Sequence, residues 1–185
     1  MVSAVPALRR VLLMVLPCLA ACGGAAANRP CTTIQAVQEP VTVMLGGDDD
    51  KAATKKLAEF LKAHGVTIVT LEDSAIGVRY RGVGAILLPK LDGGKGIDRI
   101  VVTRVFAPKD EYRGKPEIAE LAVRLNQKLN IAQFWVHDDG TLMVTSQITF
   151  MDELHLAWIA AFFDWMGAQA AQIAAVVPEA QKYLK

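Results

Sequence analysis

Cys22 is the residue of this chain whose chemistry is best defined by its surroundings. It follows two arginines, Arg9 and Arg10, an apolar run from Val11 to Leu19, and two alanines. A basic start, an apolar middle and a small-residue cleavage site are the layout of a secretion signal. We therefore predict that the chain is exported, with a cysteine at the cleavage site.

The four residues Leu19-Ala20-Ala21-Cys22 resemble the lipobox of bacterial lipoproteins. The resemblance implies that residues 1–21 are a lipoprotein signal peptide and that the Cys22 thiol carries a diacylglycerol with acyl chains such as palmitate. It also implies acylation of the new amino group, and two or more acyl chains hold a protein stably on a membrane. An Asp directly after the cysteine would resemble an inner-membrane retention signal, but Gly23 occupies that position. We therefore expect a lipid-anchored protein of the cell envelope, on the periplasmic side of the outer membrane rather than at the inner membrane.

Two other interpretations of this segment stay open. The cysteine could be incidental to an ordinary cleaved signal peptide, or the segment could be an uncleaved anchor helix. The apolar run has about half of the ~20 residues that a membrane span needs, and Pro17 interrupts it. A lipoprotein is therefore the favoured interpretation.

Residues 22–40 are rich in Gly, Ala, Pro and Thr and show no sustained period. They predict a flexible tether, followed by a single domain over residues 41–185. In the tether, Cys31 would be the only free thiol, so the fold must depend on packing and not on a disulfide. Twenty Lys and Arg against 19 Asp and Glu leave the chain close to neutral. The chain therefore lacks the basic surface that binding to nucleic acid requires.

The domain contains helical and extended patterns in turn. Asp49 or Asp50 can cap a helix that ends at Gly65, and Pro116 can open a second helix. Residues 41–45 are either a short strand or a lead-in. Four runs of β-branched or aliphatic residues lie between the two helices, at 66–71, 76–80, 83–88 and 100–106. The second helix has one apolar stripe at helical spacing, formed by Ile118, Leu121, Ala122, Leu125 and Leu129.

A β-hairpin is predicted after the second helix, and its register follows from its apolar alternation. Pairing apolar with apolar residues places Val136 opposite Leu142 and Phe134 opposite Val144. The three residues between the strands, Asp138-Asp139-Gly140, then form the loop, with the glycine in the left-handed conformation that this loop needs.

The same register places Trp135 opposite Met143 on the other, mostly polar face of the hairpin. A partly exposed aromatic side chain there is a candidate contact for a partner. The alternative is that a neighbouring helix or loop covers it.

A final apolar helix is predicted from about residue 152 to residue 177. Its length would suffice for a membrane span, but Asp164 near its middle costs about 2.5–3.5 kcal/mol in that setting. We therefore favour burial in a core or in a subunit interface. Trp158 and Trp165 on this helix join Trp135 and Met143 as candidate partner contacts.

Catalytic and metal-binding signatures are sparse. The sequence contains no Gly-x-Ser-x-Gly turn and no His-Glu-x-x-His helix. His137, Asp138 and Asp139 could hold a divalent ion loosely at the hairpin tip, but these residue types also suit a turn. We therefore predict no enzyme activity, no cofactor and no metal site. The alternative is an enzyme whose site is assembled from scattered residues.

Several segments between Asp48 and about Gln172 carry a family resemblance: Leu57–Gly65, Ile86–Leu91, Leu125–Asn130, Phe134–Leu142 and the helix with Phe162 and Trp165. In these segments the chain resembles the YbjN family of bacterial sensory-transduction regulators, which are similar in turn to type III secretion chaperones. The resemblance implies an α+β fold, with helices packed on an antiparallel sheet in the order α-β-β-β-α-β-β-α. It also implies a homodimer, and it supplies no catalytic residues.

These features together predict a lipid-anchored binding module of the cell envelope, dimeric, that holds a peptide or protein partner. The alternative is a purely structural envelope lipoprotein, with lipid and surface contacts only.

Overall fold

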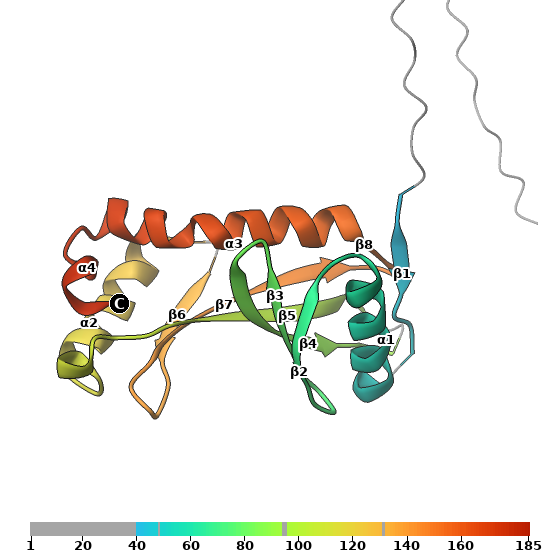
Figure 1. The fold of residues 1–185 in the computed structure, drawn as a ribbon, viewed down its shortest axis with the longest axis horizontal. Coiled ribbons are helices and arrows are strands. Elements are labelled where there is room, and N and C mark those ends of the chain that lie inside the picture. The colour runs from blue at the N-terminus through green and yellow to red at the C-terminus, as the bar shows by residue number, and fades with distance from the viewer. Residues whose placement is uncertain (1–39, 48, 94–95, 131) are drawn as a thin grey trace, which may run out of the picture. The chain divides into compact units, whose positions relative to one another are not determined.

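A computed structural model of the chain describes residues 40–47, 49–93, 96–130 and 132–185 (Figure 1). The predicted signal peptide, the predicted lipidation site Cys22, Cys31 and nearly all of the predicted tether lie outside these residues. The described part of the chain is an α+β domain in which all the paired strands run antiparallel.

Six strands form the main sheet, in the order β2-β3-β4-β5-β7-β6, and β1 pairs with β8 in a separate ribbon. The expected fold class and general order are confirmed, with four strands between the first two helices and the β1–β8 ribbon in addition. The helices are α1 (Asp50–Ala63), α2 (Pro116–Lys128), α3 (Leu156–Val176) and α4 (Ala180–Tyr183), with a 3-10 turn η1 (Asp110–Tyr112). The strands are β1 (Thr42–Met44), β2 (Thr67–Leu71), β3 (Ile76–Tyr80), β4 (Val83–Lys90), β5 (Asp98–Phe106), β6 (Gln133–Val136), β7 (Leu142–Phe150) and β8 (Glu153–His155).

The first helix begins and ends at residues suited to those positions. The Asp49 carboxylate accepts hydrogen bonds from the backbone N–H groups of Lys51 and Ala52, which have no partner inside the helix. Gly65, at φ +83°, terminates the helix in the left-handed conformation. Asp50 instead accepts hydrogen bonds from Lys90 Nζ at 2.6 Å and from the Leu91 amide, so Asp49 is the capping residue of the two candidates.

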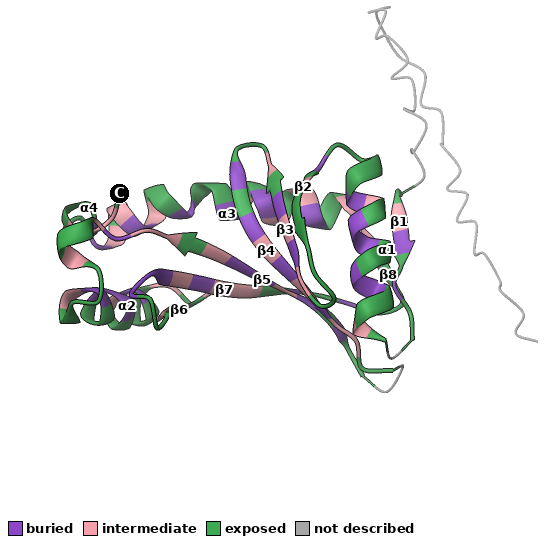
Figure 2. Cartoon of the chain, turned by 60° about the horizontal axis from the view of Figure 1, so that its bottom comes forward, coloured by how far each residue is buried: buried purple, intermediate pink, exposed green. Residues whose placement is uncertain are grey.

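All the larger helices pack on one face of the main sheet. Buried residues alternate with intermediate or exposed ones along β3 and β4, as the colours of Figure 2 show. The buried side chains form two clusters, and β5, β7 and α3 pass through both of them. The first cluster includes Leu57, Leu61, Ile76, Leu87, Ile100, Phe150 and Phe163. The second includes Ile118, Leu125, Phe134, Leu142, Val144 and Ile173.

The last long helix is shorter at its start than its sequence pattern predicts. It begins at Leu156, because the preceding residues Glu153–His155 form β8 and pair with β1. Residues 42–44 are therefore a strand rather than a lead-in, and their partner lies more than a hundred residues away in the chain. Among the described helices, none combines the length and apolarity that crossing a membrane requires.

Candidate binding site

The β6–β7 hairpin presents Trp135, and the predicted register of this hairpin is confirmed. Val136 pairs with Leu142 and Phe134 with Val144, which leaves Trp135 opposite Met143. Phe134 and Val144 are buried beneath the helices, so Trp135 and Met143 lie on the opposite face of the sheet. Because the loop between the strands fixes this register, it also determines that Trp135, and not Phe134, faces outward.

The loop at the hairpin tip is built by Asp139 and Gly140. Asp139 Oδ1 accepts hydrogen bonds from the Thr141 amide at 2.9 Å and from Thr141 Oγ1 at 2.7 Å. Gly140 has φ +81°, as the three-residue loop requires. The hydrogen bonds from Thr141 lower the pKa of Asp139 to about 2. This carboxylate thus serves the turn, and no cluster of His, Cys, Asp and Glu suited to a metal ion occurs within the described ranges.

Trp135 is partly exposed and held in a fixed orientation. Its relative exposure is 38%, and its indole Nε1 donates a hydrogen bond to Thr145 Oγ1 at 3.0 Å. A large ring of this kind, with its polar atom already bonded, can bury apolar area against a partner at a small cost in conformational entropy. The expectation of a partly exposed Trp135 is confirmed.

An apolar row continues from Trp135 across the sheet. Met143 on β7 pairs with Trp135 on one side and with Val105 on β5 on the other. Val105 has 46% of its surface exposed. Three neighbouring strands therefore present Trp, Met and Val side by side on the face that α1, α2 and α3 leave open.

Beyond Val105 the open face is hollowed into a groove of about 450 Å³ over β2 to β5. Gly77 on β3 and Gly84 on β4 line it, and at Gly84 the absence of a side chain leaves open space over the strand backbone. A Cβ added at Gly84 would meet no atom within 4 Å, whereas one at Gly77 would lie 2.3 Å from Thr70 Oγ1. Gly84 thus leaves open space in the groove, whereas the Thr70 side chain fills the space beside Gly77.

The other two candidate contacts, Trp158 and Trp165, lie on α3 and hence on the opposite side of the sheet from Trp135 and Met143. Trp158 is 49% exposed and stacks on the His155 ring, with 4.2 Å between centroids. Trp165 is half-buried and borders a small hollow of about 70 Å³ beside Gln169. The Gln169 amide is buried without a hydrogen-bond partner in the described chain. The four predicted contacts therefore form two separate groups and not one site.

The sequence model of one protein family matches residues 54–179, which cover both faces just described. The chain belongs to the YbjN family. This family is described as a "Putative bacterial sensory transduction regulator", which is not a description of an enzyme. The resemblance that the sequence segments carry is thereby confirmed at the level of the family.

Among solved structures, the chain is similar to the crystal structure of YbjN from E. coli, described as a "putative transcription regulator". The two share 14% sequence identity at a TM-score of 0.45, over 71% of this chain and 94% of the other. A comparison with curated proteins found no match.

Sequence reasoning located Trp135 and Met143 but missed the groove beside them. The sequence signal for the groove was a glycine inside each of two predicted strands, at positions 77 and 84. A glycine within a strand marks a bulge, a bend or a close approach by another backbone. Only the pairing of β3 with β4 shows that both glycines line the same hollow.

Proposed function

We propose that this YbjN-family protein is a lipid-anchored binding module of the cell envelope. It holds an extended segment of a peptide or protein partner on the open face of its sheet and catalyses no reaction. The observation that carries the proposal is the continuous path from the groove at Gly77 and Gly84, through Val105 and Met143, to Trp135. Tryptophan and methionine are enriched at protein interfaces, and binding energy concentrates on a few such residues.

Membrane attachment is assigned to the lipid on Cys22, on the resemblance of residues 19–22 to a lipobox. A Cys22→Ser variant cannot be acylated at that atom, and we expect it to move from the membrane pellet to the soluble fraction after cell lysis. Radiolabelled palmitate should be incorporated by the wild-type chain and not by the variant. Equal membrane association of the two chains would contradict lipid anchoring.

Partner binding is tested best at Gly84, because the open space there accepts a side chain without a clash. We expect Gly84→Phe to fill the groove and to keep the fold, since aromatic residues suit strands. Crosslinking in intact cells followed by mass spectrometry should recover a reproducible partner with the wild type. Recovery should fall by at least ~30-fold with Gly84→Phe, the loss of one hot-spot contact, and similarly with Trp135→Ala.

Ala119→Phe is the matched control, because it adds the same ring at an exposed position of α2 outside the groove. It should leave recovery of the partner unchanged. If all three variants behave like the wild type while deletion of the gene alters envelope integrity, the structural alternative replaces the binding module.

The homodimer is supported by the outer face of α3. Exposed residues recur there at alternating steps of four and three, at positions 157, 161, 164, 168, 171 and 175, and all except Asp164 are alanine. These steps average 3.6 residues, the period of an α-helix, so the six positions lie on one face of α3. The order of steps reads the same from both ends, so an antiparallel second copy of α3 would find the same spacing opposite it.

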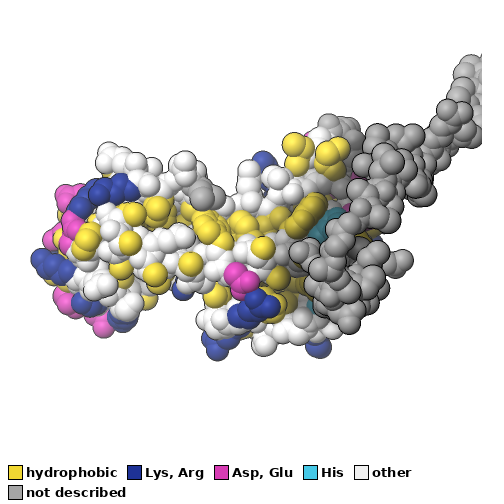
Figure 3. Space-filling view, turned by 90° about the horizontal axis from the view of Figure 1, so that it is seen from above, with side chains coloured by type: hydrophobic (Ala, Val, Ile, Leu, Met, Phe, Trp, Pro, Cys, Tyr) yellow, Lys and Arg dark blue, Asp and Glu magenta, His cyan; other side chains and the backbone are white. Residues whose placement is uncertain are grey.

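A dimer of this kind would bury no unpaired charge. Asp164 is the one charged residue of α3, and both of its carboxylate oxygens accept hydrogen bonds from Arg81 at 2.8 Å. Figure 3 shows hydrophobic side chains along the face that α3 presents, and charged side chains gathered toward the α4 end. A helix that is apolar on nearly all sides is usually covered on all of them.

A further inference from the structure

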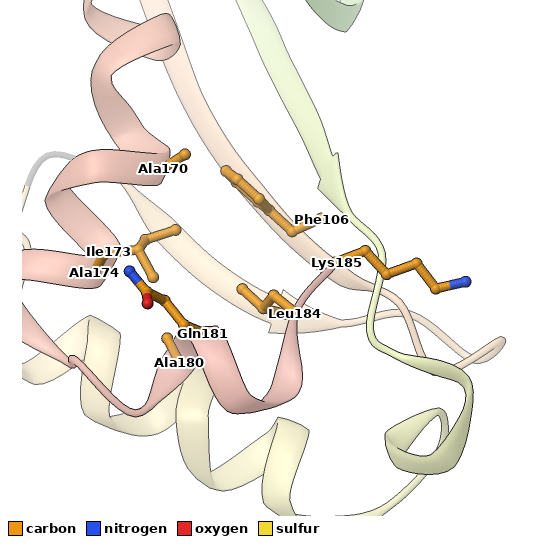
Figure 4. A pocket seen from close by; sticks show the side chains of 8 residues that line it. All are labelled: Phe106, Ala170, Ile173, Ala174, Ala180, Gln181, Leu184 and Lys185. Atoms are coloured by element: carbon orange, nitrogen blue, oxygen red, sulfur yellow. The ribbon is translucent and has the colours of Figure 1, made fainter.

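The two sides of the sheet differ in how their charges are balanced. On the helix side, a hollow of about 330 Å³ lies between the C-terminal half of α3, α4 and the end of β5 (Figure 4). Lys185 is the charged residue of its lining, and Lys185 Nζ points away from the hollow and bonds to Asp110 at 2.8 Å. The described residues that line this hollow therefore leave no charge free to select a ligand.

On the open face of the sheet, by contrast, cations lack acidic partners. Side chains alternate between the two faces along a strand, and the charged residues on the same face as Trp135 are Arg79 on β3, Lys90 on β4 and Arg99 on β5. Lys90 Nζ pairs with Asp50 at 2.6 Å. Arg79 and Arg99 form no ion pair with any described residue. No Asp or Glu shares this face in the described strands of the main sheet.

Arg79 is the free cation that borders the groove. The lining of the groove contains two arginines, Arg79 and Arg104. Arg104 donates a hydrogen bond to the backbone carbonyl of Met166, so its guanidinium is engaged by α3 on the helix side. Arg79 is exposed, and its five N–H donors have no partner within the described chain. A cation at the edge of a groove without acidic neighbours favours a partner that brings an anionic group.

Arg79 also stands at one end of a row of residues that crosses the sheet. It pairs with Gly84 on β4, while Val105 on β5 pairs with Met143 on β7, and Met143 pairs with Trp135 on β6. Gly84 and Val105 lie on neighbouring strands and line the same groove. A guanidinium and an indole ring therefore mark the two ends of one path across five strands.

The length of this row sets the spacing between the contacts of a bound segment. Four steps between neighbouring strands separate Arg79 from Trp135. Neighbouring strands lie about 4.8 Å apart, so the two ends of the row are about 19 Å apart. An extended chain advances about 3.3 Å per residue. A segment that contacts both ends therefore needs about six residues from one contact group to the other.

We propose that the bound segment is acidic at one end, with an Asp or Glu carboxylate on the Arg79 guanidinium and a large apolar side chain, about six residues away, on Trp135. This inference rests on the proposed partner site and assigns the chemistry of its occupant. Two N–H donors of arginine match the two oxygens of a carboxylate. Val105 and Met143 supply apolar surface between the two ends, and Gly84 leaves room for the backbone of the segment.

The first test selects decapeptides from a random phage-displayed library on the full chain carrying Cys22→Ser. We expect the unaltered groove to enrich peptides with Asp or Glu about six positions from an aromatic or large aliphatic residue. Arg79→Glu should reverse this preference and enrich Lys or Arg at the same position. Arg99→Glu is the matched control, because it makes the same change on the same face outside the groove lining, and it should select the same peptides as the unaltered groove.

The outcomes of this selection separate the inference from the proposed function. Peptides that are lost with Gly84→Phe but show no acidic preference overturn the inference and leave the partner site standing. Peptides that are the same for Arg79→Glu and for the unaltered groove do so as well. A lack of enrichment relative to the Gly84→Phe chain overturns both the inference and the partner site.

The second test measures the effect of the charge by calorimetry. The probes are the most enriched peptide and a copy in which its acidic residue is replaced by the corresponding amide. We expect the amide peptide to bind the unaltered groove at least ~10-fold more weakly, the effect of one charge-assisted contact. Arg79→Gln should abolish the difference between the two peptides, and Arg99→Gln should retain it, with circular dichroism to check that each variant is folded. Equal affinities of the two peptides for the unaltered groove contradict the inference. Displacement of the acidic peptide by phosphatidylglycerol vesicles would assign the face to an anionic lipid surface instead.

Discussion

Replacing Phe163 by alanine is expected to lower the free energy of unfolding by about 3–5 kcal/mol. Phe163 is 1% exposed, and its ring meets Tyr80 edge-on at 5.7 Å between centroids. It belongs to the cluster in which α3 packs on β3 and β4. Because domains are stable by only about 5–15 kcal/mol, this one truncation should remove a large part of the stability. Urea unfolding followed by circular dichroism measures it.

Trp158→Ala on the same helix is the control for this experiment. It deletes a larger side chain, but one that is half exposed and loses mainly its stacking on His155. We expect a loss of about 1 kcal/mol. If Trp158→Ala cost as much as Phe163→Ala, the packing of α3 against the sheet would not be the main source of stability in this region.

Placing glutamate at Ala168 is expected to dissociate the homodimer. Ala168 lies near the centre of the α3 seam and is exposed in the single chain, so Ala168→Glu should fold normally. In the antiparallel pair it would bring two unpaired carboxylates into an apolar interface, each opposite Asp164 of the other copy, at a cost of at least about 3 kcal/mol. The dimer should therefore weaken by ~100-fold or more, which sedimentation equilibrium or light scattering can measure.

Ala119→Glu adds the same charge to an exposed position of α2 outside the seam, and it should leave the mass of the assembly unchanged. A wild-type chain that stays monomeric at tens of micromolar would end the dimer proposal. A dimer that survives Ala168→Glu would show that another surface joins the two copies.

The β6–β7 hairpin could be predicted almost completely, because its determinants are neighbours in the chain. An apolar period of two residues defines which face is buried, and a loop of three residues with Gly140 defines the register. The start of α3 could not be predicted in this way. Residues 153–155 suit a helix locally, and they form a strand because β1 supplies its hydrogen-bond partners.

Among the candidate contacts, too, those that are close in the chain could be placed from the sequence and those that are distant could not. Trp135 and Met143 could be paired from the sequence, since both lie on one hairpin. Trp158 and Trp165 could not be placed relative to that pair from the sequence, because period-two alternation shows that two faces of a sheet differ but not which face the distant helix α3 covers. The clusters of buried side chains answer that question.

By itself the amino-acid sequence determined the α+β class, the start of the first helix at Asp49 or Asp50, the start of the second at Pro116, and the outward position of Trp135. These depend on capping, periodicity and turn chemistry within short stretches of chain. Tertiary structure alone decided the groove at Gly77 and Gly84 and the contact of β5 with α3. The groove depends on the register between two strands, and β5 meets α3 through Arg104 and Met166, which are more than sixty residues apart. Contacts over such distances follow from the order of strands in the sheet, and no local pattern encodes that order.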